Sequence, residues 1–203
     1  MTSQVEICNM ALSHLGVGKA IANLTTEKSQ EAAACNLFFD TVRDAVLGDF
    51  AWPFATKFVT LELIEEFTDS TAEWGFSYRY PVDCIKFRRI LSGSRNDSRQ
   101  TRVPFRLVED ESGTLIYTDK EDAEGEYTVR QEDYSRFSAD FTLAMSVRLA
   151  INIAPRLTKG DPFKIKKDLM VQYQGEITPA EASATNEEQP EERPESEFIS
   201  SRR

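Results

Sequence analysis

The segment 139–158 constrains the fold most, because apolar residues occupy nearly every face of the helix that it predicts. Ser138 and Asp140 are suited to the start of a helix. The apolar positions after them are Phe141, Leu143, Ala144, Met145, Val147, Leu149, Ala150, Ile151 and Ile153. A helix that is apolar all round is buried on several sides, so we predict a central core helix here. Pro155 should kink or end it, because proline removes a hydrogen bond and clashes with the carbonyl four residues earlier.

A first helix is predicted over residues 4–15 from its end signals. Ser3 and Glu6 have the spacing of a capping box, and Gly16 follows the last apolar position. The segment Gly16-Val17-Gly18-Lys19 follows a helix rather than a strand and lacks the spacing of a phosphate-binding loop. We interpret it as a helix-ending turn.

Two more helices are predicted in the same way. Thr26 can cap a helix over residues 27–47, which carries an apolar stripe. Asp161 and Pro162 are suited to the cap and the first position of a helix over residues 162–175.

Between about residues 55 and 132, apolar residues alternate with polar ones, as is typical of half-buried strands. The positions concerned are Val59, Leu61, Leu63, Phe76, Tyr78, Tyr80, Leu107, Val108, Leu115, Ile116, Tyr117, Tyr127 and Val129. We predict a small antiparallel sheet inserted between the helices. The predicted fold class is therefore α+β, mainly helical, with a helical bundle built from the N- and C-terminal segments.

Residues 178–203 are dominated by Glu, Ser, Pro, Ala and Thr, and their only large apolar residues are Phe198 and Ile199. Such a segment cannot bury enough apolar surface to fold alone. We predict one domain over residues 1–177 and an extended acidic C-terminal arm over residues 178–203 that docks on a partner protein.

The net charge of −10 disfavours a nucleic-acid-binding surface, because affinity for nucleic acid comes largely from Lys and Arg. We expect a protein made and kept in the cytosol, since no basic N-terminal region precedes an apolar stretch and no apolar run could span a bilayer. Cys8, Cys35 and Cys84 are widely spaced, and we interpret them as small buried hydrophobic residues.

The sequence lacks the patterns of catalytic and metal sites. His14 is the only histidine, and we expect it to interact with the last-turn carbonyls of the first helix. Metal-ligand spacings such as C-x-x-C and H-E-x-x-H do not occur, so we expect no metal and no cofactor. The acidic runs 109–111 and 119–124 are interpreted as solvated turns rather than as a catalytic carboxylate pair.

One basic segment stands out in this acidic chain. Its arginines are Arg95, Arg99 and Arg102, and Lys86, Arg88 and Arg89 precede them. The segment lacks the interleaved aromatic residues on which nucleic-acid bases stack, so we interpret it as a loop that is solvated or contacts an acidic protein.

Two short segments are more specific than these fold signals. They are Trp52-Pro53-Phe54-Ala55, after the second helix, and Tyr78-Arg79-Tyr80-Pro81-Val82-Asp83-Cys84, before the next strand. They occur in order with Ile7-Cys8-Asn9-Met10-Ala11-Leu12, Leu15-Gly16, Arg43-Asp44 and Leu149-Ala150-Ile151-Asn152-Ile153-Ala154. This combination, over about residues 3–176, resembles the tail tubular protein A or head-to-tail adaptor family of tailed bacteriophages.

The resemblance implies a non-enzymatic ring subunit, usually one of twelve, seated between the portal vertex of the capsid and the tail nozzle. Genomic DNA would pass through the lumen without sequence-specific binding. The protein would belong to the neck or tail of the virion and be assembled in the host cytoplasm. Such a ring closes through heterologous contacts, in which one face of a subunit meets the other face of its neighbour.

We hypothesise that the arm binds the portal protein through Phe198, Ile199, Arg202 and Arg203, and that the basic loop binds the nozzle through Arg95, Arg99 and Arg102. The structural core of the two motifs would comprise Trp52, Phe54, Tyr78, Tyr80 and Pro81. Two other classes stay open. One is a DNA-binding regulatory protein that uses the second helix and the arginine loop, and the other is a small carboxylate-dependent hydrolase.

Overall fold

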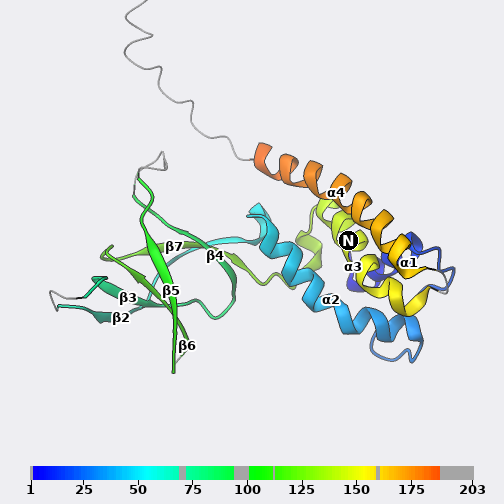
Figure 1. Ribbon diagram of the computed structural model, residues 1–203, viewed down its shortest axis with the longest axis horizontal. Coiled ribbons are helices and arrows are strands. Elements are labelled where there is room, and N and C mark those ends of the chain that lie inside the picture. The colour runs from blue at the N-terminus through cyan, green and yellow to red at the C-terminus, as the bar shows by residue number, and fades with distance from the viewer. Residues whose placement is uncertain (1, 69–71, 94–100, 112, 159–160, 188–203) are drawn as a thin grey trace, which may run out of the picture.

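The computed structural model describes residues 2–68, 72–93, 101–111, 113–158 and 161–187. Within these residues the chain has an α+β fold, as predicted, with four α-helices and two antiparallel sheets. The helices gather on one side of the molecule and the strands on the other (Figure 1).

One helix is central to the helical part. The helices are α1 (Gln4–His14), α2 (Gln30–Asp49), α3 (Ala139–Leu157) and α4 (Pro162–Asn186), with short 3-10 helices η1 (Pro53–Ala55) and η2 (Tyr134–Arg136). Helix α3 contacts α1, α2 and α4, and Phe141, Met145 and Leu149 are fully buried. The prediction of a central core helix is therefore confirmed. Among the described residues, no helix is both long and apolar enough to cross a bilayer.

Both predicted end signals of the first helix are confirmed. Ser3 Oγ accepts the Glu6 N–H at 3.2 Å, which caps the start of α1. Gly16 takes a φ of +69°, and the Val17 N–H donates to the Leu12 carbonyl at 3.1 Å. This pattern satisfies last-turn carbonyls and turns the chain away from the helix axis.

Pro155 does not end α3, which continues to Leu157. The fixed φ of proline fits a helix, and its missing N–H removes a single donor near the end, where the last turn is already close to its stop. Thr158 closes this end, because its N–H and hydroxyl both donate to the Ala154 carbonyl, at 3.0 and 2.7 Å.

The second helix begins later than predicted. Ser29 Oγ accepts the Ala32 N–H at 3.2 Å, so α2 starts at Gln30 and Thr26 is not its cap. Instead, the Thr26 N–H donates to the Asn23 side-chain oxygen at 3.0 Å within a turn. Both Thr26 and Ser29 have side chains that could cap a helix. Because Thr26 belongs to a turn in the connection from α1, Ser29 is the cap.

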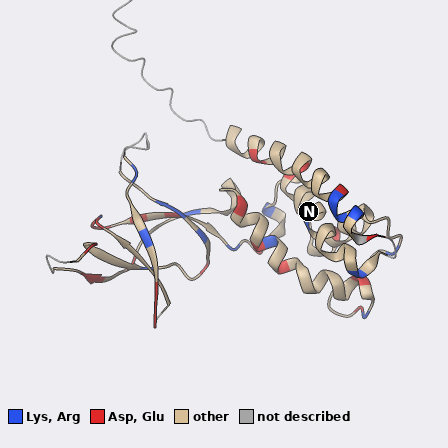
Figure 2. Cartoon of the chain, viewed as in Figure 1, with Lys and Arg blue, Asp and Glu red and all other residues tan. Residues whose placement is uncertain are grey.

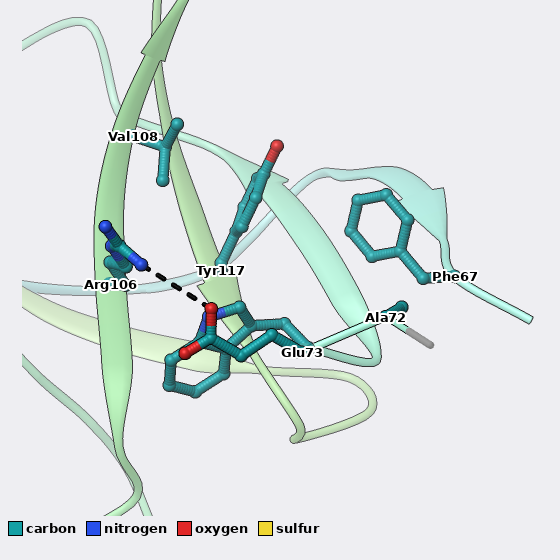
Figure 3. Close-up of a pocket in the computed structure, with 7 residues that line it drawn as sticks. Phe67, Ala72, Glu73, Arg106, Val108 and Tyr117 are labelled. Atoms are coloured by element: carbon teal, nitrogen blue, oxygen red, sulfur yellow. Dashed lines mark ion pairs between the residues drawn. The ribbon is translucent and has the colours of Figure 1, made fainter. Parts of the chain in front are cut away.

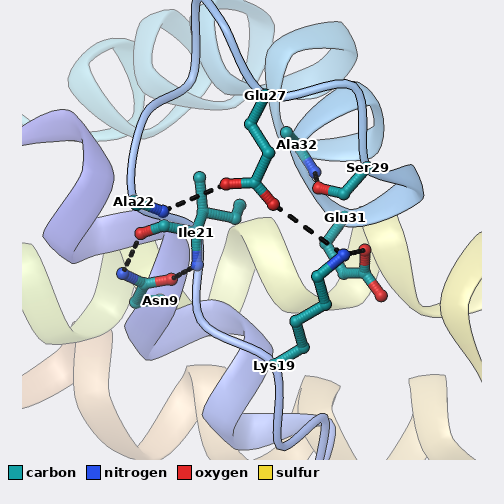
Figure 4. Close-up of polar contacts among 8 residues, drawn as sticks. All are labelled: Asn9, Lys19, Ile21, Ala22, Glu27, Ser29, Glu31 and Ala32. Atoms are coloured by element: carbon teal, nitrogen blue, oxygen red, sulfur yellow. Dashed lines mark hydrogen bonds and ion pairs between the residues drawn. The ribbon is translucent and has the colours of Figure 1, made fainter.

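The connection between α1 and α2 is held by side chains that point into it (Figure 4). The Asn9 amide donates to the Ile21 carbonyl at 2.9 Å and accepts the Ile21 N–H at 2.7 Å. The Glu27 carboxylate accepts the Ala22 N–H at 3.1 Å and lies 3.8 Å from Lys19 Nζ. Glu27, predicted in the first helical turn, therefore serves the connection instead.

Helix α4 is longer than the predicted 162–175. Asp161 caps it as predicted, since its carboxylate accepts the Phe163 N–H at 2.9 Å. The helix then runs to Asn186, so residues 178–186, predicted as part of an extended arm, are helical. Its buried stripe explains the extension: Leu169, Tyr173, Ile177, Ala180 and Ala184 all face the core.

The strands form two sheets rather than the single sheet predicted. They are β1 (Thr56–Thr60), β2 (Leu63–Glu66), β3 (Phe76–Arg79), β4 (Cys84–Ile90), β5 (Phe105–Asp110), β6 (Gly113–Thr118) and β7 (Glu124–Val129). One sheet has the order β1-β7-β4 and the other the order β2-β3-β6-β5, and all pairs are antiparallel.

The alternating residues Val59, Leu61 and Leu63 have the pattern of one strand, but they belong to two strands and their connection. Strand β1 ends at Thr60, and β2 begins at Leu63 in the other sheet. Between them Leu61 is buried, and its N–H donates to the Ala123 carbonyl at 2.8 Å. The alternation thus spans the crossing from one sheet to the other, which sequence periodicity does not reveal.

Candidate assembly surfaces

Arg102 is the predicted loop residue that the structure places, and it is exposed beside the end of α4. It lines a groove of about 710 Å³ together with Phe58 of β1 and Thr185 of α4. Arg95 and Arg99 lie outside the described residues, as do Phe198, Ile199, Arg202 and Arg203 of the arm. One groove is therefore bordered by the last turn of α4, which precedes the arm, and by the end of the basic loop. The sequence analysis assigns the arm and the loop to different partners.

The groove itself carries both charges and an exposed aromatic side chain. Arg89 forms an ion pair with Glu126, whose side chain is only 12% exposed. Phe58 beside them is 63% exposed, and Phe50 and Pro53 also contribute to the apolar part of the lining. Such a surface can take up a polypeptide through apolar and charged contacts together.

The first motif, Trp52-Pro53-Phe54, fastens the strands to the helices. Trp52 is fully buried, and its indole N–H donates to the Val46 carbonyl of α2 at 3.0 Å. Its ring lies edge-on to Phe141 of α3 at a centroid distance of 4.9 Å, and Phe54 lies 5.0 Å from the same ring. The motif therefore packs the start of β1 onto the central helix.

Arg88 is a second link between the two parts, and the sequence interpretation missed it. From β4 it donates to the Leu47 and Gly48 carbonyls at 3.3 and 3.0 Å and to the Phe50 carbonyl. It also donates to Thr128 Oγ1 at 2.9 Å. Burial lowers the pKa of Arg88.

The last turn of α2 has no basic residue of its own, so Arg88 supplies the cation and the donors that its carbonyls need. Arg88 had been grouped with the exposed basic segment. The structure corrects this assignment: its guanidinium points inward, and no signal in its strand distinguishes it from neighbouring Arg89.

The second motif holds the two sheets together. The buried Tyr78 of β3 donates its hydroxyl to the Lys120 carbonyl at 2.8 Å, in the turn that leads to β7. Asp83 accepts hydrogen bonds from the Tyr127 hydroxyl and Lys57 Nζ, both at 2.8 Å. The contact with Lys57 is the main cause of the lowered pKa of Asp83.

The other two residues of this motif support the same region. The Tyr80 ring is partly buried and lies 6.3 Å from the Phe87 ring. Pro81 is half-buried in the short connection from β3 to β4. The aromatic residues of the motif thus pack inside the strand-rich part rather than forming an exposed site.

A separate aromatic groove of about 400 Å³ lies on the four-stranded sheet (Figure 3). Phe67 and Tyr117 line it, with the Glu73 carboxylate 3.5 Å from an Arg106 nitrogen at its edge. Trp74 also lines the groove, and its indole nitrogen is buried with no acceptor among the described residues. The groove can bind a small apolar group, and sequence analysis does not reveal it because its lining comes from β5, β6 and the connection from β2 to β3.

His14 has partners in other helices instead of the last-turn carbonyls that were predicted. Its Nε2 lies 3.0 Å from Ser146 Oγ of α3, and its Nδ1 lies 3.4 Å from the Gln172 amide nitrogen of α4. Burial lowers the pKa of His14, and the nearby Glu176 partly opposes this. His14 therefore joins three helices and is not displayed in a cleft.

The described residues contain no cluster of three or more His, Cys, Asp or Glu that could hold a metal ion. Cys8 and Cys35 are buried, as predicted, and Cys84 is half-buried. The neighbouring Cys35 thiol and burial raise the pKa of the Cys8 thiol.

No protein-family model and no curated protein matches this chain.

Proposed function

We propose that this protein is a structural ring subunit of a phage neck, which connects the portal vertex of the capsid to the tail and lines part of the DNA channel. The observation that carries the proposal is the position of the two motifs. Trp52 and Phe54 join strands to the central helix, and Tyr78 and Asp83 join the two sheets. The residues of the first motif thus hold the strands to the helices, and those of the second motif hold the strand-rich part together.

In this proposal the helices act as a bundle that forms the body of a homo-oligomeric ring, a dodecamer by the resemblance. The ring is a virion component, is assembled in the host cytoplasm and has no catalytic activity. Genomic DNA passes through its lumen without base-specific contacts. The acidic net charge supports this, because a surface of net negative charge lets DNA pass without binding it tightly.

The C-terminal arm is proposed to bind the portal protein, with Phe198 and Ile199 as apolar anchors. Helix α4 supports this, because it extends to Asn186 and gives the arm a rigid root on the body. Full burial of each anchor would contribute roughly 1.5 to 3 kcal/mol. Arg202 and Arg203 can then pair with acidic groups of the partner.

The basic loop is proposed to bind the tail nozzle through Arg95, Arg99 and Arg102. Because Arg102 and Thr185 border the same groove, both contacts originate on one side of the molecule.

Binding of the full chain to purified portal and nozzle rings tests both assignments. Deletion of residues 188–203 should abolish portal binding and leave nozzle binding intact. A triple change of Arg95, Arg99 and Arg102 to Glu should have the opposite effect. A matched control is the change of Arg79, which is exposed on β3, to Glu. Undiminished portal binding by the deleted chain would contradict the assignment of the arm.

A further inference from the structure

Helix α4 is apolar on its outer side as well as on its buried side. Phe163, Met170 and Val171 are 81%, 44% and 69% exposed, and with Lys167 they follow the i, i+4, i+7, i+8 spacing of one helix face. We call this face the α4 stripe. Exposed apolar residues gathered on one face mark an interaction surface.

The charges beside the α4 stripe indicate what kind of partner fits it. Lys164, Lys166 and Lys167 lie in the first two turns, and the first turn of α4 contains no acidic residue. The Asp161 carboxylate already caps the N-terminus of α4, and Lys164, Lys166 and Lys167 are exposed beyond it. A partner that supplies acidic side chains can pair with these lysines.

Helix α2 offers a matching surface on the same molecule. Ala33, Leu37, Asp40 and Thr41 repeat the same i, i+4, i+7, i+8 spacing and are all exposed, Leu37 by 57%. We call this face the α2 stripe. The Asp40 side chain is 73% exposed, although it also pairs with Arg43.

The α2 stripe complements the α4 stripe in shape and in charge. Beside Ala33 lies a hollow of about 320 Å³, bounded by Gln30, Arg156 and Leu157, where an aromatic side chain can enter. Helix α2 carries four acidic residues and one arginine, Arg43, which is buried. A bulky basic stripe thus faces a counterpart with small residues and acidic groups.

The arrangement of the helices allows two copies to join these stripes. Helices α2 and α4 lie on different sides of α3, and both begin at the end of the molecule away from the strands (Figure 1). Figure 2 shows the basic residues of α4 near that same end. A second copy displaced sideways, with its long axis kept parallel, brings the start of its α4 to the start of the first copy's α2.

We propose that the α4 stripe of one copy packs against the α2 stripe of the next copy, with Phe163 in the hollow beside Ala33 and Lys167 near Asp40. The contact is heterologous, so the two end copies of an open chain each keep one unused stripe and further copies can add. A ring closes when the rotation from copy to copy is the same about one common axis, as the proposed function requires. The inference rests on the proposed ring function and names the two faces through which that ring forms.

The test uses full-length variants that each damage one stripe. Leu37→Asp damages the α2 stripe and Val171→Asp damages the α4 stripe, and both side chains are exposed, so the fold should tolerate them. Val82→Asp is the matched control, because Val82 is fully exposed on the connection to β4, away from both stripes. Sedimentation velocity and circular dichroism measure association and folding.

The wild type and Val82→Asp should associate beyond dimers as the concentration rises, more strongly at low salt because charge pairs contribute. Each stripe variant alone should bind itself at least about tenfold more weakly, since a buried charge replaces an apolar contact. An equimolar mixture of the two variants should form a 1:1 dimer that grows no further, because one intact stripe of each kind remains.

Three outcomes would overturn the inference. The first is a wild type that stays monomeric up to about 1 mM, a concentration at which even weak association is detected. The second is that the stripe variants associate like the wild type. The third is that the mixture of the two variants does not dimerise. Val171→Asp could instead abolish binding to vesicles of anionic lipid while Leu37→Asp leaves it intact. That result assigns the α4 stripe to a membrane surface and also overturns the inference.

Failure of this inference is distinguishable from failure of the proposed function. Portal binding through the arm is measured with residues 188–203, which neither stripe variant changes. Intact portal binding without self-association would overturn the stripes alone. Self-association through the stripes without portal binding would overturn the neck assignment alone.

Discussion

Gly125 lies in β7, the middle strand of its sheet, where an added Cβ would meet the Phe87 ring at 2.6 Å and Leu61 at 3.2 Å. Gly175, within α4, has no atom within 4 Å of the same position. A substitution should therefore have opposite effects at the two glycines. At Gly125 neighbouring side chains fill the space that a Cβ would need, whereas at Gly175 the space is open and glycine only adds conformational freedom to the helix backbone.

Gly125→Ala should therefore lower the free energy of unfolding by roughly 1–3 kcal/mol, because the Phe87 ring must move in a packed core. Gly175→Ala should raise it by about 0.5–1 kcal/mol, since alanine favours a helix more than glycine does. Urea denaturation of both variants measures the difference. Equal effects of the two changes would contradict the packing described for β7.

His14 gives the protein one titration that can be assigned without ambiguity, because it is the only histidine. The Ser146 hydroxyl donates to the Leu143 carbonyl at 2.7 Å, so His14 Nε2 must donate to Ser146 Oγ. Nδ1 is then left to accept from the Gln172 amide. The neutral ring thus satisfies both partners, and burial of the ring lowers its pKa.

The sign of the pH dependence follows from this lowered pKa. As pH falls below about 6.5, the unfolded chain binds a proton at His14 before the folded protein does, so stability decreases. His14→Gln should reduce the pH dependence of the free energy of unfolding between about pH 7 and 5. Urea midpoints of the wild type and variant across this range provide the measurement, and an unchanged slope in the variant would exclude His14 as its source.

At the scale of the elements, α4 shows that a helix can continue beyond the residues whose sequence pattern predicts it. Beyond Tyr173 the chain becomes rich in small and polar residues, yet Ile177, Ala180 and Ala184 continue the buried stripe. Ala180 and Ala184 line a small gap beside Trp52 and Phe54. Only small side chains allow the helix to approach the aromatic joint this closely.

Ala180→Asp should consequently destabilise the protein by roughly 2–4 kcal/mol, because it places an unpaired charge in this contact. The control Ala182→Asp changes an exposed position of the same helix and should cost less than about 1 kcal/mol. Hydrogen exchange of residues 178–186 should rise for Ala180→Asp alone. Equal exchange in both variants would show that the last turns of α4 do not depend on packing.

At the scale of the whole molecule, helices and sheets are joined through two links, the buried Trp52 and the half-buried Arg88. Trp52 is an apolar plug with a single hydrogen bond to Val46. Arg88 is a polar link that ends α2 and reaches Thr128 in β7 at the same time. Loss of either link should loosen the connection between the two parts as well as lower stability.

Arg88→Met should reduce the free energy of unfolding by roughly 2–4 kcal/mol, because it leaves several carbonyls at the end of α2 without donors. Far-ultraviolet circular dichroism and tryptophan fluorescence should then give different urea midpoints, as helices and strands unfold separately. Arg79→Met is the control, since the Arg79 pair with Glu62 is exposed and is worth less than about 1 kcal/mol. Coincident midpoints in Arg88→Met would argue against a coupling role.

Much of the fold could be predicted from neighbouring residues. The caps at Ser3 and Asp161, the turn at Gly16 and the core helix α3 are visible in the sequence, and so is the β-rich segment between the helices. Each depends on contacts within a few positions or on the spacing of apolar side chains. The first motif was also recognisable as a packing element before its neighbours were known.

The start of α2, the length of α4 and the division of the strands into two sheets were predicted wrongly, because several local solutions were equally good. The candidate surfaces were the least predictable. Phe163 and Leu37 have the same apolar character as buried residues in the same helices. Sequence periodicity shows that a helix has an apolar face, but it does not show whether a second apolar face packs against another element or stays exposed.

The sequence by itself determined where helices can start, which helix becomes the core and where the chain changes to strands, since these follow from short-range hydrogen bonds and apolar spacing. The tertiary structure decided what Arg88, His14 and Trp74 do, and which apolar residues stay exposed. The physical reason is distance along the chain. Ser146 is separated from His14 by 132 positions, and the carbonyls that Arg88 satisfies lie 38 to 41 positions away from it, so only folding brings these groups together.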